Sequence, residues 1–207
     1  MKRIFFMFLA LLLCGMVQAQ DNVEITLNNG NVVKGVTKTL FMLDDGDVVV
    51  AKDSKYREKK EYKSTEIKYY NKKAGEWENW IPMVAQMGMS MSYKENPKLY
   101  KNPVFLQPVY EGKNISAYIH YINTATHVKS GSIYRLAIMF YYKAKNEDFA
   151  RTYYLKDNSI GGIGQKTVLK MYFKGYPQIK EILKGLSMKE IRKDPTILVR
   201  KLDEVLE

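Results

Sequence analysis

Apolar and polar residues alternate in the first part of the chain beyond the N-terminal apolar run. In the stretch VEITLN, which begins at Val23, every second residue is apolar, and this period of two is typical of a half-buried strand. Asn29-Gly30 comes next and favours a tight hairpin turn, because both residues accept positive φ angles. Further strands are expected at residues 32–38, 39–43, 47–52, 56–62 and 66–71. Closely spaced strands with no room for a helix predict a small β-barrel over residues 20–72.

The next part of the chain has a weaker pattern. Residues 73–102 are predicted to hold one strand, within GEWENWIPMV, and then an irregular linker. The linker is expected because the methionine-rich run has no clear period and because two prolines, Pro97 and Pro103, interrupt the residues after it.

A second β region is predicted from residue 103 onward. Strand patterns occur at residues 104–110, 114–123, 132–142 and 149–156. Short turns between them predict an antiparallel meander. Pro108 cannot donate a ladder hydrogen bond, so the first of these strands is expected at an edge or at a bulge.

The pattern becomes helical near the C-terminal end. Val168, Leu169 and Tyr172 recur at helical spacing, Pro177 opens a second helix, and Asp194-Pro195 is typical of a helix start. Strands that precede helices in this way are typical of the α+β class. The prediction is an α+β protein with a small N-terminal β-barrel, then an antiparallel sheet with the C-terminal helices of residues 103–207 packed on one face.

The N-terminal residues predict export. Lys2 and Arg3 precede an apolar run that ends at Leu13, and Val17 and Ala19 suit a small-x-small cleavage site. This is the layout of a signal peptide over residues 1–19, with cleavage after Ala19. An alternative is lipid attachment at Cys14, although a lipidation motif has a small residue where Leu13 stands. The expected location is the periplasm or cell envelope.

Cleavage would change the composition in two useful ways. Cys14 is the single cysteine, so the processed chain would have no disulfide, no thiolate metal site and no cysteine nucleophile. The net charge would fall from +11 to +9 through the loss of Lys2 and Arg3. A basic exported protein is expected to bind an anionic envelope component, a glycan or another envelope protein, and not nucleic acid. No transmembrane segment is expected after processing.

Motifs for cofactors and metals do not fit. The glycine-rich stretch IGGIGQKT, residues 160–167, lacks the contiguous Gly-Lys-Thr of a phosphate-binding loop. His120 and His127 have no acidic residue near them in the sequence, as a zinc site would need. Asp44, Asp45 and Asp47 lack the spacing of a calcium loop. Neither a cofactor nor a metal is predicted.

Two sets of residues remain as site candidates. Glu76 and Glu78 flank Trp77 in a predicted strand, and paired carboxylates can serve glycoside hydrolysis. The second set combines cationic and aromatic side chains on the face opposite the apolar residues of the second sheet, where they could bind an anionic or sugar ligand. Its members are Arg135, Arg151, Tyr118, His120 and Tyr141.

Two resemblances accompany these patterns. The stretch VEITLNNGNVVKG, with an apolar strand and a glycine turn after it, resembles the start of an Sm-like small barrel. This resemblance implies a barrel shape and no RNA binding. At the level of the whole chain, the signal ending in VQAQ, the YEGK hairpin, the tyrosine-rich sheet and the closing helices resemble uncharacterised exported proteins of Bacteroidetes-type bacteria. That resemblance implies a compartment and an architecture without an activity.

These observations predict an exported, non-catalytic binding or interaction protein of the bacterial periplasm or envelope. The alternative is a hydrolase that acts on an envelope glycan or polymer through Glu76 and Glu78. A third possibility is a protein held by its positive charge on an anionic envelope surface.

Overall fold

The computed structural model describes residues 20–38, 48–53, 55, 57–74, 76–89, 95–128, 131–157 and 166–206. The predicted signal peptide lies outside these residues. The strands are β1 (Gln20–Leu27), β2 (Val32–Lys38), β3 (Val48–Val50), β4 (Lys60–Tyr62), β5 (Ile67–Ala74), β6 (Glu76–Met83), β7 (Val104–Tyr110), β8 (Ile115–Val128), β9 (Gly131–Ala144) and β10 (Arg151–Asp157). The helices are the 3-10 helix η1 (Ser64–Glu66), α2 (Lys166–Tyr172), α3 (Ile179–Gly185), α4 (Met188–Lys193) and α5 (Ile197–Val205).

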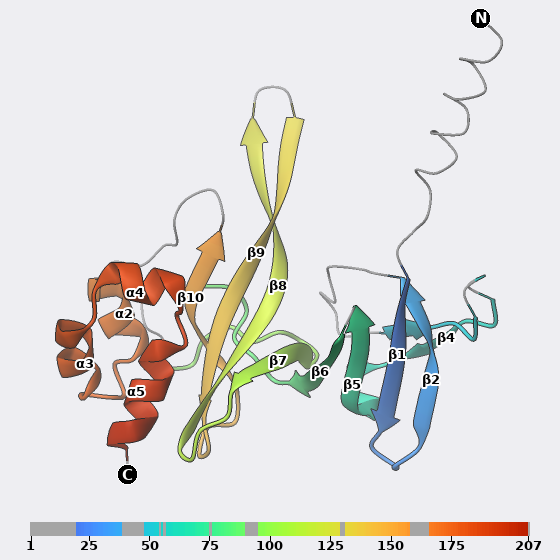
Figure 1. Ribbon diagram of the computed structural model, residues 1–207, viewed down its shortest axis with the longest axis horizontal. Coiled ribbons are helices and arrows are strands. Elements are labelled where there is room, and N and C mark those ends of the chain that lie inside the picture. Colours follow the sequence, from blue (N-terminus) through green and yellow to red (C-terminus); the bar gives the residue numbers. More distant parts are fainter. Residues whose placement is uncertain are drawn as a thin grey trace, which may run out of the picture.

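Eight strands form one antiparallel sheet in the order β10-β9-β8-β7-β6-β5-β1-β2. Figure 1 shows the helices beside β9 and β10 at one end of this sheet and β1 and β2 at the other. The β1–β2 connection is a tight turn, in which Gly30 has a φ of 86° and donates its main-chain N–H to Leu27. The β8–β9 hairpin extends well beyond its neighbours (Figure 1).

The predicted N-terminal barrel is wrong, because the described strands do not close. β3 and β4 form a separate pair, which one bridge between Val36 and Ala51 joins to β2. A side chain at Gly35 would overlap the main chain of Ala51, so a glycine permits this close approach. β5 pairs with β1 on one side and with β6 on the other. In a barrel, this second edge of β5 would pair with β4. Because β6 occupies that edge, the sheet continues toward β7 instead.

The α+β assignment is also corrected, because the protein is predominantly β. β6 and β7 pair through Ile81–Met83 and Val104–Leu106 and so join the two expected units into one sheet. The α-helices are short, at six to nine residues each, whereas β8 and β9 have 14 residues each. The predicted strand at residues 39–43 lies outside the described residues.

Three apolar clusters hold the fold together. The first lies between the helices and β8–β10, where the ring of Tyr142 stacks on that of Phe173 at 4.6 Å. The second lies between the β3–β4 pair and the sheet, with Val50 and Tyr70 among its members. The third lies on the opposite face of β7–β9 and includes Tyr141.

The segment expected as an irregular linker forms the cover of that third cluster. In its described parts, residues 84–89 and 95–100, Ala85 pairs with Ala150 and Gln86 pairs with Leu99. The hydroxyl of Thr152 on β10 donates to the carbonyl oxygen of Gly88 at 3.0 Å. Around this cluster, both faces of the sheet are therefore covered.

Candidate functional site

The sheet splits between β6 and β7. Their pairing ends at Ile81 and Leu106. Before this point, residues 76–80 of β6 pair with β5, and beyond it residues 107–110 of β7 pair with β8. Among the described residues, no strand pairs with the other side of these two segments. Each of them therefore presents a strand edge toward the split, where main-chain groups can accept a new partner.

An open groove of about 540 Å³ occupies this split. We call it the split groove, and its lining residues are Glu78, Asn79, Gln107, Pro108, Val109, Tyr110 and Glu111. Its lining residues belong to β6, to β7 and to the residue that follows β7, and Figure 1 shows these two strands as neighbours. The two walls come from parts of the chain that the sequence analysis assigned to different units.

Acceptor groups dominate the polar part of the split groove. The carboxylate of Glu78 accepts a hydrogen bond from the indole N–H of Trp80 at 3.3 Å. Glu111 stands exposed where β7 ends. The side-chain oxygen of Gln107 is buried without a hydrogen-bond partner among the described residues. A buried acceptor without a donor costs free energy, and Gln107 is one of the lining residues of the groove.

A buried carboxylate fixes one wall of the groove. Asp203 of α5 is 8% exposed and accepts four hydrogen bonds. They come from the hydroxyl of Tyr110 at 2.9 Å and from the main-chain N–H groups of Lys113 at 3.0 Å, Asn114 at 2.7 Å and Ile115 at 3.1 Å. We call this arrangement the Asp203 latch, because it fastens the last helix to the β7–β8 turn.

The latch also sets the ionisation of its carboxyl. Burial alone would raise the pKa of Asp203, but the hydrogen bonds from the turn and from Tyr110 outweigh burial and hold the pKa below the ordinary 3.8. The same hydrogen bond raises the pKa of Tyr110. Gly112 is required at the turn, since a side chain there would overlap the Asp203 carboxylate.

Sequence reasoning missed the latch. Its visible sign was an acidic residue next to Leu202, beside the apolar stripe of the last helix. The partner Tyr110 is 93 positions away in the chain, so the sequence pattern gave no indication of what the carboxylate binds.

The predicted cationic and aromatic set does not form an open surface. Arg151 is 9% exposed; its Nε donates to Glu147 at 2.9 Å, and its guanidinium also donates to the carbonyl oxygen of Glu95 at 3.2 Å. It therefore ties β10 to the covering segment. Tyr141 is fully buried, and Tyr118 packs against the same third cluster. Burial raises the pKa of both phenols.

The remaining members of that set are also accounted for. His120 is 3% exposed, and its Nδ1 lies 3.1 Å from the carbonyl oxygen of Phe105. Arg135 lies in β9 opposite Thr124, and its side chain is outside the described part of the structure. The binding role proposed for these residues stays a prediction.

Several other sequence candidates lie outside the described residues. They are the side chains of Glu76 and His127, the aspartates Asp44, Asp45 and Asp47, and residues 160–165 of the glycine-rich stretch. Within the described residues, no three His, Cys, Asp or Glu side chains are grouped as a metal ion would require.

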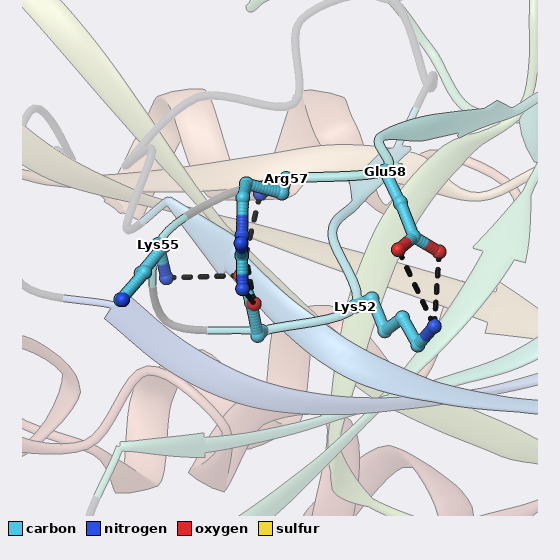
Figure 2. Close-up of polar contacts among 5 residues, drawn as sticks. Lys52, Lys55, Arg57 and Glu58 are labelled. Atoms are coloured by element: carbon cyan, nitrogen blue, oxygen red, sulfur yellow. Dashed lines mark hydrogen bonds and ion pairs between the residues drawn. The ribbon is translucent and has the colours of Figure 1, made fainter.

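The densest charged run, residues 52–63, is partly neutralised by its own acids. Lys52 pairs with Glu58 at 3.0 Å, and Arg57 pairs with Asp53 at 2.6 Å (Figure 2). The hydrogen bond from Arg57 lowers the pKa of Asp53. Lys52 and Arg57 therefore already have carboxylate partners.

Comparison of the chain with protein-family models, with curated proteins and with solved structures found no match. The two resemblances drawn from the sequence therefore stay predictions. Of the helices that the structure describes, none combines the length and the apolar character needed to cross a membrane.

Proposed function

We propose that this chain is an exported, non-catalytic interaction protein of the bacterial periplasm or envelope, which binds an extended segment of another envelope protein in the split groove. The observation that carries the proposal is the pair of strand edges along the groove, β6 at residues 76–80 and β7 at residues 107–110. An extended peptide can add to such an edge through main-chain hydrogen bonds, and pockets along the edge then select its side chains.

The groove's chemistry narrows the partner. Glu78 and Glu111 contribute carboxylates, and Gln107 contributes a buried acceptor. These groups favour a segment with lysine, arginine or other donor side chains and disfavour an anionic ligand. Pro108 is a lining residue without a main-chain N–H, so it cannot donate a hydrogen bond to an added strand.

A labelled decapeptide of alternating valine and lysine is a direct probe. We expect saturable binding that weakens as salt is raised from about 0.05 M to about 0.5 M, because exposed charges are screened. Glu78→Lys and Glu111→Lys should each weaken binding by roughly fivefold or more. The matched control is Glu61→Lys on the exposed side of β4, which should bind as the wild type does. Equal weakening in all three variants, or no saturable binding, would overturn the proposal.

A second candidate is the hydrolase. The observation that favours it is that the split groove takes one carboxylate from each wall, Glu78 and Glu111, and glycoside hydrolysis uses two carboxyl groups on either side of the scissile bond. The test is release of soluble fragments from dye-labelled peptidoglycan. For a hydrolase, Glu78→Gln or Glu111→Gln should lower the rate by about 100-fold or more. Absence of release by the wild type would exclude this activity on that polymer.

A further inference from the structure

A small pocket lies where η1 meets the chain just before β7. It has a volume of about 300 Å³ and is lined by Lys63, Ser64, Thr65, Lys101 and Asn102. We call it the lysine pocket. It shares no residue with the split groove, so the two sites can be tested separately.

The hydroxyl of Ser64 is the unusual group in this pocket. Ser64 is 2% exposed, and its Oγ has no hydrogen-bond partner among the described residues. Burial of a hydroxyl without a partner costs free energy, and native structures keep few such groups. Ser64 is a lining residue of the pocket, so rotation of its side chain toward the pocket would let the hydroxyl donate a hydrogen bond to an oxygen-rich ligand.

The main chain around Ser64 is held in place. Asn28 of the β1–β2 turn donates its side-chain N–H to the carbonyl oxygen of Thr65 at 2.8 Å and its main-chain N–H to that of Glu66 at 2.9 Å. Glu66 in turn donates its N–H to the carbonyl oxygen of Lys63 at 2.9 Å. A site with fixed geometry binds its ligand with a smaller loss of conformational entropy.

The charge of the pocket is positive. Lys63 and Lys101 line it, and none of its lining residues is acidic. The nearby carboxylate of Glu66 accepts from the main-chain N–H of Lys63 at 3.2 Å and is not part of the lining. In the described residues neither lysine has a carboxylate partner, unlike Lys52 and Arg57 in the adjacent loop.

We propose that the lysine pocket binds a phosphate or sulfate group. The two ammonium groups would balance its charge, and the Ser64 hydroxyl would donate to one of its oxygens. This chemistry is shared by a free inorganic ion and by the headgroup of an anionic lipid. Under this proposal, two of the many lysines of this basic chain form a specific anion site.

Calorimetric titration of the full chain with inorganic phosphate, repeated with sulfate, tests the site. We expect saturable one-to-one binding to the wild type. Lys63→Gln, Lys101→Gln and Ser64→Ala should each weaken it by roughly tenfold, since each removes one charge-assisted contact. The control is Lys180→Gln, which removes the same charge from the exposed surface of α3 and should leave the affinity unchanged.

Ser64→Ala also separates loss of the site from loss of the fold. Because the hydroxyl has no partner in the described structure, this variant without phosphate should melt at the wild-type temperature or above it. Added phosphate should raise the melting temperature of the wild type and not that of the variant. If Ser64→Ala melts normally and still binds phosphate as the wild type does, the proposal is overturned.

Two further results would also overturn it. One is no saturable binding of either ion up to about 50 mM, and the other is equal weakening by Lys180→Gln, which would indicate general charge attraction. Vesicles of phosphatidylglycerol, compared with phosphatidylcholine, distinguish the sources. Binding that is lost in Lys63→Gln and Lys101→Gln would assign the site to a lipid headgroup, whereas phosphate binding without vesicle binding would assign it to the free ion.

Discussion

Asp203 is a buried charge whose partners are nearly all main-chain N–H groups. Asp203→Asn keeps the size of the side chain but replaces one acceptor oxygen with a donor that would face those N–H groups. We expect the free energy of unfolding to fall by about 2–4 kcal/mol, as measured by urea denaturation. Glu204→Gln, at the exposed neighbouring position, should change it by less than about 0.5 kcal/mol. Equal stability of the two variants would contradict the latch.

The latch also predicts a dependence of stability on pH. The pKa of Asp203 is lowered in the folded protein, so its contribution is complete above the ordinary value of 3.8 and is lost as the pH falls through the lower folded value. The stability difference between wild type and Asp203→Asn should therefore narrow between about pH 6 and about pH 2. The measurement is the urea midpoint of both proteins across this pH range. If the stability difference between them does not change with pH, the stabilisation by Asp203 would come from packing alone.

At the scale of elements, the segment over the third cluster depends on Arg151. The side chain links β10 to Glu147 and to the carbonyl oxygen of Glu95. Arg151→Ala would leave Glu147 partly buried without its cation and should cost about 3 kcal/mol. Hydrogen exchange should increase at the main-chain amides of Met87 and Tyr100, because both donate hydrogen bonds to carbonyl oxygens within this segment. Arg192→Ala, at an exposed position on α4, is the control and should leave both amides protected.

The approach of β2 to the β3–β4 pair gives another test. Gly35→Ala would place a methyl group against Ala51 and Val50, so we expect a loss of about 1–3 kcal/mol in unfolding free energy. Gly185→Ala in α3 has open space around it and should be neutral or stabilising by up to about 1 kcal/mol. If Gly35→Ala were as stable as Gly185→Ala, the two strand pairs would not be in close contact.

Local strand positions could be predicted from the sequence, because alternation is a local property. The predicted strand 104–110 coincides with β7, and the turn after β1 has its glycine at positive φ. The pairing of β5 with β6 could not be predicted in this way. Both β4 and β6 are close to β5 in the sequence, and which of them pairs with β5 depends on the packing of the whole sheet. The split groove could not be predicted either, because it depends on where β6 and β7 stop pairing.

The predicted ligand face shows a different limit of sequence reasoning. Alternation correctly separates His120 and Tyr141 from the apolar face of their strands, but it does not reveal what covers the other face. Residues 84–89 and 95–100 lacked a period and therefore gave no sign that they pack there. A polar or aromatic residue in a strand can thus be part of a second core.

At the scale of the molecule, one sheet connects cores that the sequence assigned to separate units. The rings of Trp80 on β6 and Tyr121 on β8 lie 5.8 Å apart and link the first two clusters. We therefore expect one cooperative unfolding transition. Tryptophan fluorescence, which reports β6, and far-ultraviolet circular dichroism, which reports the helices, should give the same urea midpoint. Two distinct midpoints would show that the halves unfold independently.

The Asp203 latch has a consequence for biogenesis. A polypeptide is synthesised, and normally translocated, from its amino end, so the β7–β8 turn emerges about 90 residues before the carboxylate that holds it. Until residue 203 has been synthesised, Tyr110 in the β7 wall of the split groove and the β7–β8 turn after it lack the carboxylate that accepts their hydrogen bonds. A nascent chain therefore cannot complete this groove until synthesis has passed the last helix. If the groove binds an extended peptide as proposed, that binding would be deferred until then.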